Sequence, residues 1–246
     1  MTERLLLIGA TSAIAHAVAR RFAARGARIV LLAREPQRLQ ANADDLRVRG
    51  ATEVHCIPFD ALQTTSHAAA LDHAYAALGG FDAALLAYGS LPDQSACELS
   101  PQLAVQAFEL NATSVLAVLT DLAGRFESQG SGVIGVISSP AGDRGRASNY
   151  VYGAAKAAVT ALTSGLRHRL GRRGVRVVTL LPGFVDTPMT ASFKKGPLWA
   201  TPERVAADID KALASGFGSV YTPWFWRWIM LLVRSVPERL FIRTRL

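Results

Sequence analysis

The chain has little cysteine, no long uninterrupted hydrophobic run and no dense run of like charge. Its two cysteines among 246 residues exclude a disulfide framework, and Cys56 lies in the apolar run VHCIPF, where we expect a buried thiol in a reducing cytoplasm. The apolar run 224–233 is much shorter than the roughly 20 residues that span a bilayer, and Arg227 interrupts it. We expect no signal peptide, because the first apolar stretch passes straight into a turn at Gly9. We also expect no metal site.

Positive charge is concentrated at the C-terminal end. The net charge is +8, and from Thr222 onward five arginines face one acid: Arg227, Arg234, Arg239, Arg243 and Arg245 against Glu238. A basic balance raises nucleic acid and anionic membranes as partners. No nucleic-acid-binding motif accompanies it, and the other charges are scattered as on ordinary solvated helices, so we expect no nucleic-acid partner.

Short apolar runs alternate with helical patterns along the chain. The predicted strands are 4–9, 27–33, 53–59, 81–88, 132–138, 175–181 and 219–223. Continuous rather than alternating apolar strands indicate a parallel sheet that helices cover on both faces. We therefore predict an α/β fold: one Rossmann-type domain over 1–222, with a doubly wound, mostly parallel seven-stranded sheet, and a basic, aromatic, amphipathic extension over 223–246. The segment 186–200 is predicted to be a loop over the ligand crevice.

The stretch GATSAIA, residues 9–15, follows the first strand and lacks two glycines expected in a dinucleotide-binding turn. Gly9 keeps the turn, and small residues lead into a helix whose N-terminus favours phosphate. We expect Ala13 and Ala15 to lie over a pyrophosphate with their methyl groups turned aside, and the amides from Ser12 to Ile14 to bind it. An ordinary strand, turn and helix is the alternative.

Arg34 ends the second strand where an adenosine ribose would lie. An acidic residue there accepts a hydrogen bond from the ribose 2′-hydroxyl, whereas arginine suits a 2′-phosphate, so Arg34 favours NADP over NAD. A solvent-exposed arginine at the start of a polar helix is the alternative. Asp60 ends the third strand, where it reaches the adenine edge or serves as a helix cap or turn residue.

Tyr152 and Lys156 are four residues apart on a predicted helix, so both project from one face. A nearby ammonium favours the phenolate and lowers the pKa of a tyrosine, which can then protonate a carbonyl oxygen. Ser138 and Ser139 end the fifth strand, where a hydroxyl can hold the same oxygen. Tyr150 is the competing phenol, but Ala154 stands where its lysine would be. The alternative is a surface pair of tyrosine and lysine.

These segments together resemble the short-chain dehydrogenase/reductase family over almost the whole chain to residue 222. The resemblance implies that Tyr152 is the general acid, Ser139 polarises the carbonyl, Lys156 holds the nicotinamide ribose and lowers the tyrosine pKa, and Asn111 anchors a relay water. The predicted cofactor-binding residues are Gly9, Thr11, Ser12, Ala13, Ile14, Arg34, Asp60, Ala61, Ala87, Gly89, Tyr152, Lys156, Pro182, Gly183, Val185 and Thr187. Two segments depart from the family pattern, the first loop (Ile8, Ala13 and Ala15) and LAYG at 86–89, and both departures affect cofactor affinity more than proton transfer.

Four further segments resemble a narrower group within the family, the reductases of decaprenylphosphoryl-ribose 2′-epimerases. They are FDALQTTSH (59–67), the stretch 138–158, PMTASFKKGPL (188–198) and the stretch 221–241. The resemblance implies a lipid-linked 2-keto sugar made by a separate flavin-dependent oxidase, and it favours NADH, against the indication from Arg34. Four cations are candidates for contact with the lipid phosphate, or are solvated loop charges: Arg144, Arg146, Lys194 and Lys195.

The C-terminal extension has more than one interpretation. Three tryptophans with flanking arginines indicate an interfacial helix that contacts the inner face of the cell membrane. A helix buried between subunits, or folded over the crevice, is the alternative. We expect a homo-oligomer from the family resemblance. The function hypotheses are a reductase of a lipid-linked keto sugar, a cytoplasmic carbonyl reductase of another substrate, and a nucleotide-sensing protein without turnover.

Overall fold

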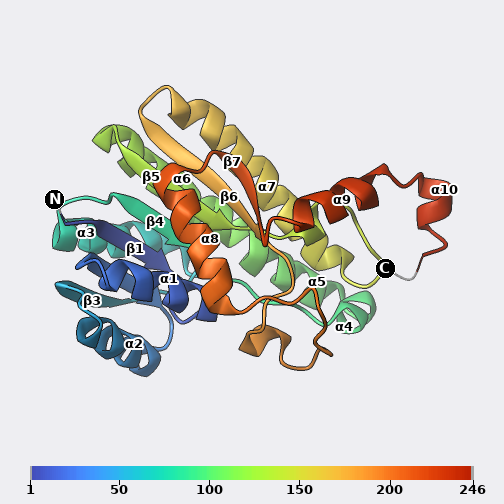
Figure 1. Cartoon of the computed structure of the whole chain (residues 1–246), viewed down its shortest axis with the longest axis horizontal. Coiled ribbons are helices and arrows are strands. Elements are labelled where there is room, and N and C mark those ends of the chain that lie inside the picture. Colours follow the sequence, from blue (N-terminus) through green and yellow to red (C-terminus); the bar gives the residue numbers. More distant parts are fainter. Residues whose placement is uncertain (1, 245–246) are drawn as a thin grey trace.

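The computed structural model describes residues 2–244, which form a sheet of seven parallel strands (Figure 1). The strands run in the order β3-β2-β1-β4-β5-β6-β7. Their bounds are β1 (Arg4–Ile8), β2 (Arg28–Ala33), β3 (Glu53–Pro58), β4 (Ala83–Leu86), β5 (Gly132–Ile137), β6 (Val175–Pro182) and β7 (Gly218–Thr222). The predicted fold class and the seven predicted strands are confirmed.

The strands are apolar throughout because helices cover both faces of the sheet. Leu5 and Leu7 of β1 belong to one buried cluster, whereas Leu6 and Ile8 belong to the other. The first cluster includes residues of α1 (Ala13–Ala23), α2 (Pro36–Val48) and α8 (Pro202–Ser215), and the second includes residues of α3 (His67–Leu78), α6 (Ser114–Gln129) and α7 (Tyr150–Gly171). Period-two burial in a strand thus supplies two cores, one on each side.

The strand order reverses at β1, which has β2 on one side and β4 on the other. The loops after β1 and β4 therefore diverge, and a crevice opens at the carboxyl ends of the strands. Short elements surround this end of the sheet or connect to it: η1 (Thr64–Ser66), α4 (Gln94–Leu99), α5 (Pro101–Phe108), η3 (Pro140–Gly142) and η4 (Pro188–Thr190). The predicted crevice loop, 186–200, contains η4.

Helix α5 continues through a π-helical turn, η2 (Glu109–Thr113), into α6. The combined stretch Pro101–Gln129 is long and apolar enough to cross a membrane by length and composition. Val118, Leu119, Leu122 and Phe126 are buried in the core on one face of the sheet. Packing against the sheet therefore explains much of its apolar composition.

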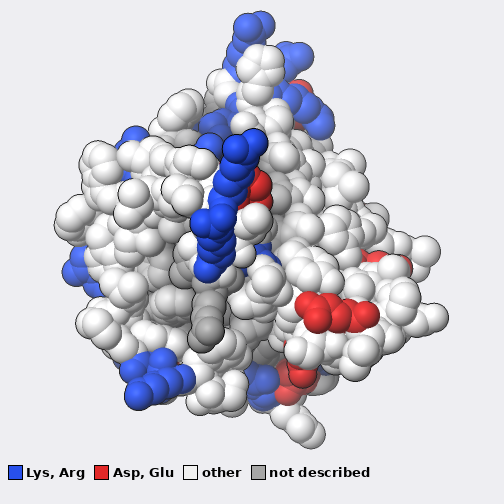
Figure 2. Space-filling model, turned by 90° about the vertical axis from the view of Figure 1, so that its right-hand side faces the viewer, with Lys and Arg blue, Asp and Glu red and all other residues white. Residues whose placement is uncertain are grey.

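The C-terminal extension forms α9 (Trp226–Ser235) and α10 (Glu238–Phe241), which project from one end of the molecule (Figure 1). Trp226 and Met230 are buried, whereas Leu231 and Leu232 are exposed. Figure 2 shows this end of the molecule face-on, largely uncharged and with more basic than acidic side chains. Residues 245–246, and with them the predicted basic residue Arg245, lie outside the described part of the chain.

Candidate active site

A cavity of about 960 Å³ lies at the carboxyl edge of the sheet. The loops after β1 to β6 line it, together with the start of α7 and Trp226 of α9. This volume is near the upper end of the ~300–1,000 Å³ usual for ligand sites, which suits an extended ligand. Every residue predicted to bind the cofactor lines the cavity. Segments far apart in the chain therefore meet at one cavity.

The first loop is unstrained despite its missing glycines. Gly9 has φ +85°, and a Cβ there would lie 2.6 Å from the backbone nitrogen of Tyr88, so only glycine fits. Ala13 is the first residue of α1, and within residues 2–244 every residue with positive φ is a glycine. Ala15 is fully buried in the core and does not line the cavity, so the expectation that it lies over a pyrophosphate is wrong.

The helix that begins at this loop suits a pyrophosphate group. The Ser12 amide donates to the Gly9 carbonyl at 3.0 Å and closes the turn, so it is not free for phosphate as we expected. The amides of Ala13 and Ile14 open α1 and have no carbonyl one turn earlier in the helix to bond. With the positive end of the helix dipole, these two amides fit the phosphates of a dinucleotide.

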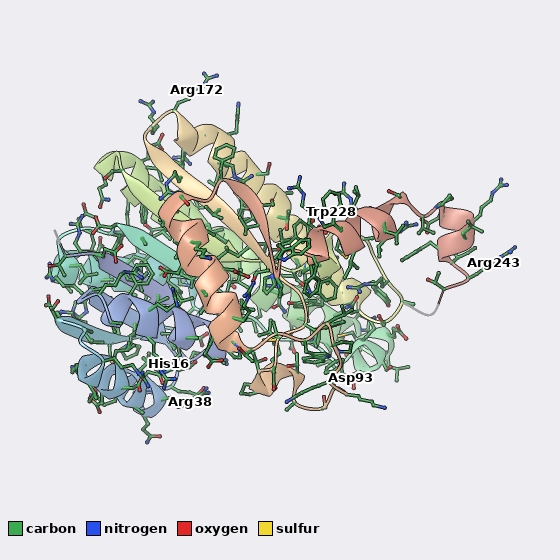
Figure 3. All side chains as sticks on the ribbon, viewed as in Figure 1. His16, Arg38, Asp93, Arg172, Trp228 and Arg243 are labelled. Atoms are coloured by element: carbon green, nitrogen blue, oxygen red, sulfur yellow. The ribbon has the colours of Figure 1, made fainter. Side chains whose placement is uncertain are left out.

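Arg34, Asp60 and Ala61, predicted to contact the adenosine part of the cofactor, line the cavity. Sequence reasoning missed Arg38, which also lines the cavity, donates to the Thr11 carbonyl at 3.1 Å and pairs with Glu35 at 2.9 Å (Figure 3). Arg38 lies on α2, four residues after Arg34, and this spacing could have indicated that the two arginines lie close together. The Asp60 carboxylate accepts from the Leu62 amide at 3.0 Å, as expected of a turn residue, and its contact with the adenine edge stays a prediction.

Asn111 lies behind the cavity wall in the π-helical turn. Its Oδ1 accepts from the Ser90 amide at 3.0 Å, and its Nδ2 donates to the Ala107 carbonyl at 2.9 Å. A side chain that bonds to a carbonyl one turn earlier competes with the backbone ladder, which accounts for the widened turn. Asn111 is fully buried and does not itself line the cavity, although the adjacent Leu110 does. Its relay role stays a prediction.

Ser139, Tyr152 and Lys156 all line the cavity, whereas the competing phenol Tyr150 is 45% exposed and does not. The structure also separates the two candidate serines. The Ser138 hydroxyl is buried and donates to the Lys156 carbonyl at 2.9 Å, so it holds β5 against α7. The Ser139 hydroxyl accepts from the Ala141 amide at 3.2 Å and lines the cavity, where it also shares a hydrogen bond with the Tyr152 phenol.

Burial sets the protonation of Tyr152 and Lys156. It raises the pKa of the Tyr152 phenol to about 12, with a hydrogen bond from Ser139 acting in the opposite direction. Burial lowers the pKa of the Lys156 ammonium to about 8. The ammonium donates to the Ile137 carbonyl at 3.1 Å and lies 5.7 Å from the centre of the Tyr152 ring. The Tyr152 pKa is therefore raised overall and not lowered as predicted, because loss of water has the largest effect. Tyr152 is neutral and carries a transferable proton.

The loop after β6 brings Pro182, Gly183, Val185 and Thr187 to the cavity, as predicted. A Cβ on Gly183 would lie 1.9 Å from the indole nitrogen of Trp226. Gly183 therefore lets the first residue of α9 reach the cavity. Sequence reasoning missed Trp226, because its contact with residue 183 leaves no local pattern in the chain.

The four cations predicted to contact substrate are separated by the fold. Arg146 lines the cavity, but Arg144, Lys194 and Lys195 do not. Arg144 turns to the C-terminal extension, where it donates to the carbonyls of Val233 and Val236 at 2.6 and 2.5 Å and pairs with Glu238 at 2.8 Å. Lys195 pairs with Asp186 at 2.5 Å. The predicted contact between Arg144 and substrate is therefore wrong, because the Arg144 guanidinium bonds to the C-terminal extension instead.

Comparison with known proteins places the chain in a family. The family described as short chain dehydrogenase matches residues 3–197. An uncharacterized oxidoreductase of Streptomyces coelicolor is 40% identical over 97% of this chain and 94% of that protein, and one of Mycobacterium tuberculosis is 38% identical over 95% and 94%. A structure of an actinorhodin polyketide ketoreductase variant with NADPH has a TM-score of 0.80 at 26% identity, covering 89% of this chain and 95% of that one.

These names specify no lipid-linked sugar, so the narrower resemblance to epimerase reductases stays a prediction. The family itself rests on the matched residues, on the sheet, and on the meeting of Ser139, Tyr152 and Lys156 at one cavity. This chain belongs to the short-chain dehydrogenase family and is an NAD(P)-dependent oxidoreductase.

Proposed function

We propose that the protein reduces the 2-keto group of a polyprenylphosphoryl pentose and so forms the arabinose epimer. The observation that carries this proposal is a row of aromatic rings that leads from the cavity to the surface. Phe184 stacks on Trp199 at 5.4 Å and meets Trp226 edge-on at 5.1 Å, and all three line the cavity. The row continues through Phe225 to Trp224, which is 65% exposed. An apolar tail on the substrate has a path along these rings.

The catalytic residues suit reduction of a ketone. When bound, the nicotinamide cofactor supplies the hydride. Tyr152 is neutral and donates its proton to the carbonyl oxygen, while the Ser139 hydroxyl donates a hydrogen bond to the same oxygen. Lys156 is cationic below its pKa of about 8, and this charge stabilises the phenolate that remains after proton transfer.

We propose NADPH as the preferred cofactor. Arg34 is exposed at the adenosine end of the cavity, and among residues 2–244 no carboxylate pairs with it. Arg38 adds a second guanidinium nearby on α2, although Glu35 offsets its charge. Free guanidinium groups favour a 2′-phosphate over a ribose hydroxyl. This preference departs from the NADH that the narrower resemblance favours.

We propose that the C-terminal extension contacts an anionic membrane at the inner face of the cell membrane. Several of its large apolar side chains are exposed: Trp224, Trp228, Leu231, Leu232, Leu240 and Ile242. Arginines lie among them at 227, 234, 239 and 243, and the acid Glu238 is paired with Arg144. Exposed aromatic and aliphatic groups with flanking arginine suit the boundary between lipid tails and phosphates.

Two protein partners belong to the same proposal. A flavin-dependent oxidase is needed to make the 2-keto sugar. A second copy of this chain fits the exposed apolar side chains of α5 and α6, which include Leu103, Val105, Phe108 and Leu116.

A coupled assay tests the substrate. The protein is incubated with the flavin-dependent oxidase, polyprenylphosphoryl ribose and NADPH, and the sugar released from the lipid is identified. We expect the arabinose epimer with the native protein and only the oxidised or unreacted sugar with Tyr152→Phe, because the variant lacks the proton donor. Absence of arabinose with the native protein contradicts the lipid-linked substrate and leaves the oxidoreductase family untouched.

A carbonyl reductase of another substrate is the second candidate, favoured by the likeness to a polyketide ketoreductase. In that case the protein reduces acyl, steroid-like or free sugar ketones when each is offered with NADPH, and the C-terminal extension serves a subunit contact. A protein that only senses nucleotides predicts a third result: cofactor binding equal in the native chain and Tyr152→Phe, with no ketone reduced by either.

A further inference from the structure

Three polar atoms in the wall of the cavity are buried without a hydrogen-bond partner. They are Nε of Arg146, Oδ1 of Asn149 and Nε1 of Trp226, and none has a partner within residues 2–244. All three residues line the cavity. A buried polar atom without a partner destabilises the folded chain. Three of them at one cavity indicate that a ligand, not the protein, completes the hydrogen bonding there.

Trp226 is held so that its N–H cannot easily turn away. The side chain is 5% exposed, its indole nitrogen lies against Gly183, and Phe184 packs on it edge-on. Helix α9, which carries Trp226, is fixed at its other end by Arg144. The Arg144 guanidinium donates to the carbonyls of Val233, Arg234 and Val236, which lie at the C-terminal end of α9.

Arg146 and Asn149 come from the loop between η3 and α7. The Asn149 amide donates to the Arg146 carbonyl at 3.1 Å, so the two residues share one tight turn. The Asn149 carbonyl in turn accepts from Gly153 at 2.8 Å, and this bond fixes the turn to the start of the helix that carries Tyr152. Asn149 is therefore placed within one helical turn of the predicted proton donor, and the tight turn holds Arg146 beside Asn149.

The charge of Arg146 indicates which kind of ligand these three side chains bind. Burial lowers the pKa of Arg146, although the Asp143 carboxylate acts in the opposite direction, and no ion pair forms between the two side chains within the described residues. A half-desolvated guanidinium without a paired carboxylate favours an anionic ligand. Two N–H donors suit phosphate oxygens, and one carbonyl oxygen suits a hydroxyl.

We propose that Arg146, Asn149 and Trp226 form a subsite for a phosphate ester that the substrate carries next to its ketone. The N–H groups of Arg146 and Trp226 donate to phosphate oxygens, and Oδ1 of Asn149 accepts from a sugar hydroxyl. This subsite deepens the function proposed above and rests on ketone reduction at Tyr152, but it holds for a lipid phosphodiester and for a free sugar phosphate alike. Trp226 of the C-terminal extension then takes part in substrate recognition.

Calorimetric titration of the full chain tests the subsite with three probes: dihydroxyacetone, dihydroxyacetone phosphate and the farnesyl diester of that phosphate. In the two phosphorylated probes the ketone lies one carbon from the oxygen that bears the phosphate. We expect dihydroxyacetone phosphate to bind at least tenfold more tightly than dihydroxyacetone. Tighter binding of the farnesyl diester assigns the subsite to a lipid-linked sugar, and tighter binding of the monoester assigns it to a free sugar phosphate.

Variants of Arg146 and Trp226 test whether the subsite causes the tighter binding of the phosphorylated probe. Arg146→Gln removes the charge, Arg146→Lys keeps the charge without Nε, and Trp226→Phe keeps an aromatic ring without the N–H. We expect each to lower the preference for the phosphorylated probe three- to tenfold or more, with Arg146→Gln lowering it most. Arg172→Gln, which removes a charge at the distant end of α7, is expected to keep it (Figure 3). Circular dichroism confirms that each variant is folded.

The subsite and the proposed substrate fail in different ways. Equal binding of phosphorylated and unphosphorylated probes, or a preference unchanged in both Arg146→Gln and Trp226→Phe, overturns the subsite even if the coupled assay yields arabinose. Absence of arabinose in the coupled assay, with the phosphate preference present and lost in these variants, overturns the lipid-linked substrate and keeps the subsite. Failure of both phosphorylated probes to bind also overturns the subsite.

Discussion

At the scale of single residues, Lys156 shows a conflict between stability and chemistry. The side chain is buried, and its one hydrogen bond within the described structure is to the Ile137 carbonyl. Its pKa falls from 10.5 to about 8 because burial disfavours the charged form. Because the pKa is lower in the folded than in the unfolded chain, folding releases protons between these two values. Stability therefore rises with pH from about 8 to 10.5, and the full cost of the buried charge is present at pH 7.

Replacing Lys156 with methionine is expected to stabilise the protein and abolish its activity. The pKa difference corresponds to about 3 kcal/mol at pH 7, and we expect Lys156→Met to recover on the order of 2 kcal/mol of it. Urea unfolding at pH 7 and pH 10 measures this gain, which should shrink at the higher pH. Lys211→Met, at an exposed position of α8, is the control. A destabilised Lys156→Met would show that the bond to Ile137 outweighs the desolvation.

Arg34 is a second single residue with a large expected effect, because its guanidinium is expected to decide between NADPH and NADH. We predict that Arg34→Ala raises the KM for NADPH about 10- to 100-fold, as expected for the loss of charge-assisted hydrogen bonds to a phosphate. The KM for NADH should change less than twofold. Steady-state kinetics with both cofactors measures the ratio, with Arg172→Ala as a control for the loss of a distant charge. An equal rise for NADH would assign Arg34 to the fold or to the adenosine moiety.

At the scale of elements, the sequence predicted what is local and missed what joins distant segments. Continuous apolar runs identify the buried strands, because both faces of a parallel sheet are covered. The short motifs likewise place Ser139 and Tyr152, since both follow from their position at a strand end or on a helix face. Arg144 was a candidate for contact with the lipid phosphate, because its loop was expected to flank the crevice. Its actual partner, Val233, is 89 positions away, and such a contact leaves no periodic signal.

The link between Arg144 and α9 is expected to control the C-terminal extension. Arg144→Ala leaves the last carbonyls of α9 without their donor and exposes Phe241, on which the guanidinium lies at 3.7 Å. We predict a loss of about 2 kcal/mol of local stability and faster tryptic cleavage after Arg234. Arg144→Lys is expected to be intermediate, because it keeps the charge without the planar fork.

Limited proteolysis followed by mass spectrometry measures this cleavage, and Arg172→Ala serves as the matched control. The loss should be confined to the extension, so the thermal midpoint of the main domain should change little. Ketone reduction should also weaken, because Trp226 forms part of the cavity wall. Unchanged cleavage in Arg144→Ala would show that Trp226 and Met230 hold α9 without the arginine.

At the scale of the whole molecule, the extension gives the protein two unlike ends. The edge near α2 and β3 carries many paired charges, whereas the end that bears α9 and α10 combines exposed apolar groups with arginine (Figures 1 and 2). The sequence predicted this asymmetry from the tryptophans and the C-terminal arginines. It left open whether the helix would be buried or exposed. The structure shows both, because Trp226 and Met230 face inward while Leu231 and Leu232 face outward.

This outward face leads to a prediction about the intact protein. We expect the native chain to co-sediment with vesicles that contain phosphatidylglycerol, less so at high salt, and little with phosphatidylcholine alone. Leu231→Asp with Leu232→Asp should abolish binding while the thermal midpoint stays unchanged, because both side chains are exposed. The matched control is Val48→Asp with Leu99→Asp, at positions 90% and 88% exposed on other helices, which should bind as the native chain does. Equal sedimentation of the two double variants would show that the outward face of α9 does not contact lipid, and a shift from dimer to monomer in the first variant would assign that face to a second copy of the chain.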